Sequence, residues 1–321
     1  MLIRYLAARL RHRDPSVVRY LRMGLGIENR ARKQAPFWAE HLDRSRAAQA
    51  RWTLRASGER LTVLGAGRLL DFNRSAIPPR FTNLRLVDAD PLCPPIWRSI
   101  AKPVEAVCAD VSGCLNRWIA ELNRIRKPWP ETLAAIREHR VPSRAAYRAP
   151  TDALLSLNIL SQLQIVWQDG VEDFLTERFG RRFVEHQEDE WLDALRPAGQ
   201  MLVEQHLAAI EDSGPRFVLL ITDLEYLDYQ GRTFQRGHWA PPPVEWSNAG
   251  WHAESPVTCE VSPALEGVEL NEDAFARWLP SYRLAWRESW LWHIAPLGTE
   301  KKTPHGKVHR VGAFALERTT R

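Results

Sequence analysis

Cysteine and long apolar runs are scarce in this chain, and each shortage removes a class of protein. The four cysteines among 321 residues show no C-x-x-C spacing, which predicts free thiols rather than a disulfide framework, a redox pair or a zinc site. No run of 18 uncharged apolar residues occurs, so we expect neither a transmembrane segment nor a secretory signal. We therefore expect a globular, cytoplasmic protein without a metal.

The positive charge is gathered near the N-terminus. Residues 1–60 hold fourteen Arg or Lys against five Asp or Glu, whereas the whole chain has a net charge of +5. Apolar residues recur among these arginines at three- and four-residue spacing, which predicts helices, one of them from Ala35 toward Trp52. We interpret residues 1–58 as an N-terminal helical extension. A basic segment of this kind suits a solvated helix face, or a surface for RNA or an anionic membrane.

Residues 59–321 have the pattern of an α/β domain. Short apolar runs separated by helical segments are typical of strands buried on both faces of a parallel sheet. The runs are 61–64, 84–88, 104–110, 152–158 and 217–223. Two aromatic segments, 283–294 and 309–316, predict a terminal hairpin. Between these parts, the Trp- and Pro-rich residues 229–280 predict an irregular insertion on the substrate side.

The first apolar run ends in Gly65-Ala66-Gly67. Two residues without Cβ allow a ligand to approach the backbone, and we expect a strand, a glycine turn and then a helix whose first N–H groups are free to bind it. Asp88 follows Gly67 by 21 residues, a spacing at which an acid accepts hydrogen bonds from ribose hydroxyls. Asp110 ends the third run in the same way. Each acid alone is better explained as a turn former or a helix cap, but the carboxyl ends of parallel strands meet at one crevice, and agreement among three of them favours a cofactor site.

Together these segments resemble a class I S-adenosylmethionine-dependent methyltransferase. The resemblance rests on VLGAGRLLD at 63–71, LVDADP at 86–91, VCADV at 107–111 and ALLSLNILSQL at 153–163. It implies a doubly wound, mostly parallel seven-stranded α/β sheet whose last strands are the terminal hairpin, and S-adenosylmethionine as cofactor. The usual acid before the first glycine is absent, Leu69 replaces the third glycine, and no N/D-P-P-Y motif follows the fourth run, which disfavours methylation of nucleic-acid bases.

The resemblance also implies roles for single residues. Gly65 and Gly67 would line the methionine and ribose portions of the cofactor. Asp88 would bind the ribose diol, Asp110 would face the adenine amine, and residues 156–158 would lie near the sulfonium. The cofactor-binding candidates are Gly65, Ala66, Gly67, Asp71, Asp88, Ala89, Asp110, Val111, Ser156, Leu157 and Asn158. The candidates for orienting the acceptor or removing its proton are Asn158, Asp223 and Glu225.

The leading functional hypothesis is methyl transfer to oxygen or nitrogen of a small-molecule acceptor. The N-terminal helices and the insertion would enclose this acceptor, with Trp239, Trp246 and Trp251 as candidate walls. Two alternatives stay open: a non-catalytic protein of this fold that binds RNA or membrane through its N-terminus, and an NAD-dependent oxidoreductase. The missing third glycine and the acid after the third run count against the oxidoreductase. The sequence does not determine the oligomeric state.

Overall fold

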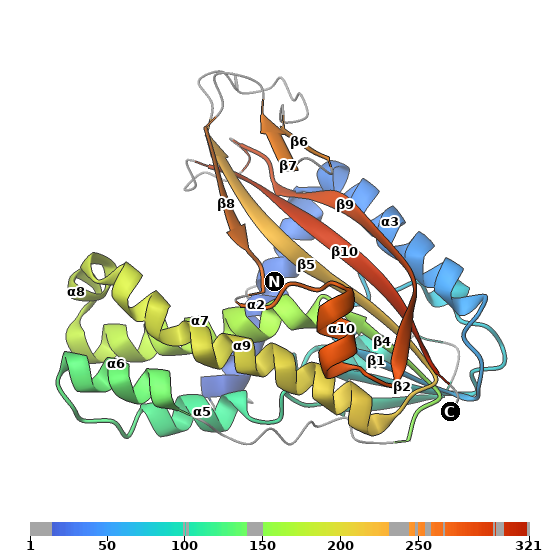
Figure 1. Ribbon diagram of the computed structural model, residues 1–321, viewed down its shortest axis with the longest axis horizontal. Helices are drawn as coiled ribbons and strands as arrows, with labels where there is room; N and C mark the ends of the chain where they lie inside the picture. The colour runs from blue at the N-terminus through green and yellow to red at the C-terminus, as the bar shows by residue number, and fades with distance from the viewer. Residues whose placement is uncertain are drawn as a thin grey trace.

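A twisted β-sheet separates two layers of helices (Figure 1). This computed structural model describes residues 15–319 except 99, 101–102, 140–149, 231–243, 248–249, 254–257, 266, 298 and 300–304. The strands follow the order β3-β2-β1-β4-β5-β10-β9, and β8 pairs with β5 beside this path. The order turns back between β1 and β4, which is where open α/β sheets bind ligands.

Five strands of the path are parallel to one another. They are β1 (Arg60–Leu64), β2 (Asn83–Asp88), β3 (Val104–Cys108), β4 (Ala153–Leu157) and β5 (Phe217–Gln230). The terminal strands β9 (Tyr282–Ala295) and β10 (Gly306–Arg318) are antiparallel to each other, and β10 is antiparallel to β5. The predicted fold, a doubly wound sheet with an antiparallel terminal pair, is confirmed.

Helices cover both faces of the sheet. On one face, α3 (Ala35–Thr53) and α4 (Cys93–Trp97) share an apolar cluster with β1, β2 and β9. On the other, α9 (Glu188–Ser213) and α10 (Glu272–Trp278) pack on β4, β5 and β10. A third cluster joins α9 to α5 (Leu115–Leu122), α6 (Trp129–Glu138), α7 (Ile159–Phe179) and α8 (Arg181–His186). Among the described residues no helix is long and apolar enough to cross a membrane.

The helices predicted near the N-terminus are present. The N-terminal region forms α2 (Pro15–Lys33) and α3, the latter within one residue of its expected ends. The acidic segment at 270–273 starts α10, where the Asn271 side chain accepts a hydrogen bond from the amide of Ala274 at 2.9 Å. This is the side-chain cap that satisfies a free N–H at a helix start.

The prediction of a helix directly after the glycine turn is wrong. The described residues 65–82 form turns and a short 3-10 helix, η1 (Arg74–Ala76). Leu69 has a φ of +60°, a left-handed conformation that a right-handed helix cannot contain. The Gln49 side chain on α3 donates to the carbonyl of Asp71 at 2.7 Å and accepts from the amide of Asn73 at 2.9 Å. Helix α3 thus supplies hydrogen bonds that a local helix would have supplied to this backbone.

The sheet differs from the expectation at two further places. Strand β3 is at the edge and is largely exposed, so it is not buried on both faces like β1 and β4. In the insertion, β6 (Val244–Ser247) and β7 (Gly250–Ala253) form a hairpin, and β8 (Thr258–Pro263) pairs with an extension of β5. The described part of the insertion is therefore more regular than expected, because the long β5 offers it a pairing edge.

Packing of α3 on the sheet can be tested with two residues at its end. Trp52 is 2% exposed in the apolar cluster, whereas Leu54 is 83% exposed. We expect Trp52→Ala to lower the free energy of unfolding in urea by about 3–5 kcal/mol, because it leaves a large cavity. Leu54→Ala should change it by less than about 0.5 kcal/mol. Equal effects would contradict the docked position of α3.

Candidate functional site

A cavity lies at the carboxyl ends of β1, β2 and β4, where the strand order turns back. Nine of the eleven residues predicted to bind cofactor line it. They are Gly65, Gly67, Asp71, Asp88, Ala89, Asp110, Val111, Leu157 and Asn158. Ala66 is buried in the apolar cluster instead, and the Ser156 hydroxyl points to His206, whose Nε2 is 3.2 Å away. The alternation of side chains along β4 sends Ser156 to the other face of the sheet from Leu157.

The glycine turn is closed by its own hydrogen bonds. The amides of Gly65 and Ala66 donate to the carbonyl of Val87 at 3.0 and 3.2 Å, and the amide of Gly67 donates to Asp88 Oδ2 at 2.9 Å. These amides are therefore not free, contrary to the expectation from the sequence. Glycine is still required at position 65, because φ is +68° and a Cβ there would lie 2.4 Å from the carbonyl oxygen of Leu157.

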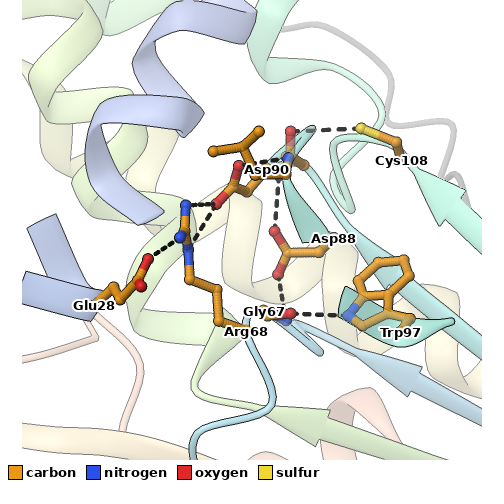
Figure 2. Close-up of polar contacts among 9 residues, drawn as sticks. Glu28, Gly67, Arg68, Asp88, Asp90, Trp97 and Cys108 are labelled. Atoms are coloured by element: carbon orange, nitrogen blue, oxygen red, sulfur yellow. Dashed lines mark hydrogen bonds and ion pairs between the residues drawn. The ribbon is translucent and has the colours of Figure 1, made fainter. Parts of the chain in front are cut away.

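Asp88 links the turn to the end of β2 (Figure 2). Its second oxygen accepts from the amide of Asp90 at 2.8 Å. Burial raises the pKa of Asp88 to about 6, although the hydrogen bonds from the Asp90 and Gly67 amides oppose that rise. A carboxylate offers about four lone-pair positions. Asp88 can thus stabilise the turn and still accept hydrogen bonds from a ligand.

Asp110 both caps a helix and borders the cavity. Its Oδ1 accepts from the amide of Ser112 at 3.0 Å, and its Oδ2 accepts from the amide of Leu115 at 2.9 Å, at the start of α5. Burial is the main cause of its raised pKa. The capping role considered from the sequence is therefore present, and the same carboxylate lines the cavity beside Val111.

Asp71 and Asn158 form a polar pair at another part of the cavity wall. Asn158 has a φ of +49° and donates from Nδ2 to Asp71 Oδ2 at 3.3 Å. Its Oδ1 is buried and has no hydrogen-bond partner among the described residues. Burial raises the pKa of Asp71 to about 6. This pair thus combines an unused acceptor with a half-buried, partly desolvated carboxylate.

An ion triad ties the N-terminal helix to the site (Figure 2). Arg68, which follows the glycine turn, bonds Asp90 Oδ2 through two nitrogens at 2.9 and 3.2 Å and also pairs with Glu28 on α2. Asp90 in addition accepts from the amide of Leu92 at 2.9 Å. Asp90 is therefore engaged with Arg68 and with the segment leading into α4.

The N-terminal helices supply residues that the sequence did not single out. They line the cavity with Tyr20, Met23, Gly24 and Ile27 from α2, and Trp38, His41 and Leu42 from α3. The spacing of three and four residues identifies a helix face. It does not say what that face packs against, and so these positions could not be assigned from the sequence.

His41 is a neutral imidazole with a defined tautomer. It stacks on Trp292 with ring centroids 4.0 Å apart, and Trp290 Nε1 lies 3.1 Å from His41 Nδ1. An indole N–H can only donate, so Nδ1 accepts and the ring proton resides on Nε2. Burial lowers the pKa of His41 to about 3. His41 can consequently donate a hydrogen bond and does not act as a base at neutral pH.

Two predicted catalytic residues lie outside the cavity lining. Asp223 is fully buried, accepts a hydrogen bond from Ser161 Oγ at 3.0 Å and lies 3.4 Å from His309 Nδ1. Glu225 is held by Arg310 through two 2.8 Å hydrogen bonds and by Trp251 Nε1, also at 2.8 Å. Glu225 borders a second cavity on the far part of β5.

The aromatic walls differ from those expected. Trp246 packs on the Arg310 guanidinium, 4.6 Å from its ring centroid, and belongs with Trp251 to the surroundings of Glu225. Trp239 lies outside the described residues. The site cavity is instead walled by Trp38 and Trp292. Trp292 packs in the apolar cluster on its strand face and also borders the cavity.

No protein-family model and no curated protein matches the chain. An S-adenosylmethionine-dependent methyltransferase from Clostridium acetobutylicum is 8% identical with a TM-score of 0.34, and the match covers 90% of this chain and 92% of that chain. The amino pentose methyltransferase CalS10 from Micromonospora echinaspora is 13% identical over 91% and 96%, with a TM-score of 0.32. The (4+2)-cyclase SpnF is 9% identical over 87% and 81%, with a TM-score of 0.36.

These identities and TM-scores are too low to support an argument about this chain. A shared fold does not fix a function. What this chain does has to be inferred from its own cavity.

The buried state of Asp71 predicts a pH effect on stability. Its pKa of about 6 in the folded protein exceeds the value of 3.8 for an exposed Asp, so the folded state binds the proton more tightly. The free energy of unfolding of the unmodified protein should then fall, relative to Asp71→Asn, by roughly 1–3 kcal/mol as pH rises from about 4 to about 6. Urea unfolding of both proteins at pH 4.5 and 7.5 measures this. If the difference in free energy of unfolding between the two proteins is the same at both pH values, the raised pKa of Asp71 is refuted.

Proposed function

We propose that this chain is an S-adenosylmethionine-dependent methyltransferase that acts on a small-molecule acceptor. One observation carries the proposal: the glycine turn, Asp88, Asp110 and Asn158 come from four separate strand ends and line one cavity at the turning point of the sheet. Each residue has a structural explanation on its own. Their convergence is what supports a cofactor site.

The charge of the cavity suits this cofactor. Its lining contains four carboxylates, on Asp71, Asp88, Asp90 and Asp110. The lining's described guanidinium, on Arg68, is already paired with Asp90 and Glu28. A cationic sulfonium and the hydroxyls of a ribose are favoured in such surroundings, whereas a polyanion is repelled. The wall thus supports a small acceptor over nucleic acid.

Individual residues fit parts of the cofactor. Asp88 retains acceptor capacity for the ribose hydroxyls. Asp110 already accepts hydrogen bonds from the amide and hydroxyl of Ser112 and from the amide of Leu115, so it would contribute its negative charge beside the adenosyl group. At Gly67 a Cβ would meet no atom closer than 3.8 Å, so this face of the turn gives a ligand room against the backbone. The partnerless Oδ1 of Asn158 is suited to accept a hydrogen bond from a ligand. Asp71 beside it offers the negative charge that a cationic group needs.

The acceptor would lie toward the α3 side of the cavity. The walls there are Trp38, Leu42 and Trp292, with His41 among them. Mostly apolar walls with few polar groups are typical of small-molecule sites. The protonated Nε2 of His41 can donate to an oxygen or nitrogen of the acceptor and hold it in place.

S-adenosylmethionine supplies an electrophilic methyl group when it is bound. The contribution of the protein is to align the acceptor and, for a hydroxyl or ammonium, to remove its proton. Asp71 is better suited to this second task than Asp223 or Glu225, since it lines the cavity and its pKa of about 6 leaves it largely ionised at neutral pH. Glu225, tied to Arg310, is not retained as a catalytic candidate.

Isothermal titration calorimetry with S-adenosylmethionine, S-adenosylhomocysteine and NAD tests the proposal directly. We expect the first two to bind. Asp88→Ala should weaken that binding at least tenfold, because it removes charge-assisted hydrogen bonds worth about 1.5–3 kcal/mol. Asp189→Ala, at an exposed position in the first turn of α9, should leave it unchanged. Binding of NAD alone would instead support the oxidoreductase, and unchanged affinity in Asp88→Ala would remove the ribose assignment.

A further inference from the structure

One face of α2 crosses the ends of three parallel strands. Tyr20, Gly24 and Glu28 are four residues apart, so they lie along the same side of the helix. Gly24 lies against Asp90, which follows β2, and Glu28 pairs with Arg68, which follows β1. Tyr20 lines the cavity with Asp110, which follows β3. The helix is thus fitted to the carboxyl ends of β3, β2 and β1 in turn.

Gly24 makes this close approach possible. A Cβ at Gly24 would lie 2.0 Å from Asp90 Oδ2, whereas a Cβ at Gly26, two residues away, would meet nothing within 4 Å. A glycine inside a helix destabilises it by about 1 kcal/mol relative to alanine. At Gly24 the close contact with Asp90 explains why glycine is present despite this cost. At Gly26 no close packing gives such a reason.

The hydroxyl of Tyr20 is buried in the cavity without a hydrogen-bond partner among the described residues. Burial, followed by the negative charge of Asp110, raises the pKa of Tyr20 well above its ordinary value. The hydroxyl therefore keeps its proton at neutral pH and can both donate and accept. Buried polar groups in folded proteins are nearly always hydrogen-bonded, so an unpaired hydroxyl at a cavity wall is suited to bind a ligand.

We propose that Tyr20 is a cofactor-binding residue, whose hydroxyl hydrogen-bonds the adenosyl group beside Asp110 and makes α2 a wall of the cofactor site. This inference rests on the proposed function. It adds that the N-terminal extension takes part in binding, so that docking of α2 and binding of the nucleoside stabilise each other.

Calorimetry with S-adenosylhomocysteine tests the hydroxyl. Tyr20→Phe should weaken binding between about threefold and tenfold, as expected for one hydrogen bond. The melting temperature of the unliganded variant should not fall, because the lost hydroxyl has no described partner in the protein. Equal affinity in Tyr20→Phe and the unmodified protein would overturn the assignment.

The two glycines provide a matched test of the helix. Gly24→Ala should displace α2 from Asp90 and weaken binding of S-adenosylhomocysteine more than tenfold. Gly26→Ala should leave affinity unchanged, since its Cβ points to open space. Comparable affinity in the two variants would contradict a role for docked α2 in binding.

Hydrogen–deuterium exchange separates this inference from the proposed function. In the unliganded protein, Gly24→Ala should raise amide exchange along α2, while Gly26→Ala should leave it unchanged or slow it. If α2 responds in this way but the unmodified protein binds no S-adenosylhomocysteine, the cofactor proposal and the Tyr20 assignment both fail and only the docking survives. If S-adenosylhomocysteine binds without slowing exchange in α2, the coupling is wrong while the function stands.

Discussion

The hydrogen bond from the Gly67 amide to Asp88 is the contact on which the site depends. It joins the turn after β1 to the end of β2 and fixes both at the point where the strand order turns back. The same carboxylate holds the amide of Asp90, whose own carboxylate holds Arg68. A single half-buried acid therefore organises the turn and, through Asp90, the guanidinium that reaches the N-terminal helix. Its hydrogen bonds satisfy amides of an irregular segment that has no helix or strand partner for them.

The sheet and most of the cavity wall could be predicted because they depend on local patterns. Apolar runs predict strands, and the residues that follow parallel strands all lie at the same edge of the sheet. Asp88, Asp110 and Asn158 were found in this way. Ser156 was misplaced by one position, since neighbouring residues of a strand face opposite sides.

What could not be predicted depends on contacts between distant segments. The helix expected after the glycine turn is replaced by turns because Gln49, on another helix, satisfies that backbone. His41 and Tyr20 have no local feature that marks them, and they enter the site because α3 and α2 pack beside it. Helical periodicity identifies a buried face without naming its partner. Sequence patterns thus predict the part of the cavity lining at the strand ends better than the part that α2 and α3 contribute.

The ion triad has unequal exposure to solvent, which matters for how firmly α2 is held. The side chains of Arg68 and Asp90 are 6% and 5% exposed, whereas that of Glu28 is 38% exposed. Dissolved salt screens exposed charges far more than buried ones. Raising the ionic strength would therefore weaken the outer pair and leave the inner pair intact. The wall formed by α2 should therefore respond more to the ionic medium than the walls built on the sheet.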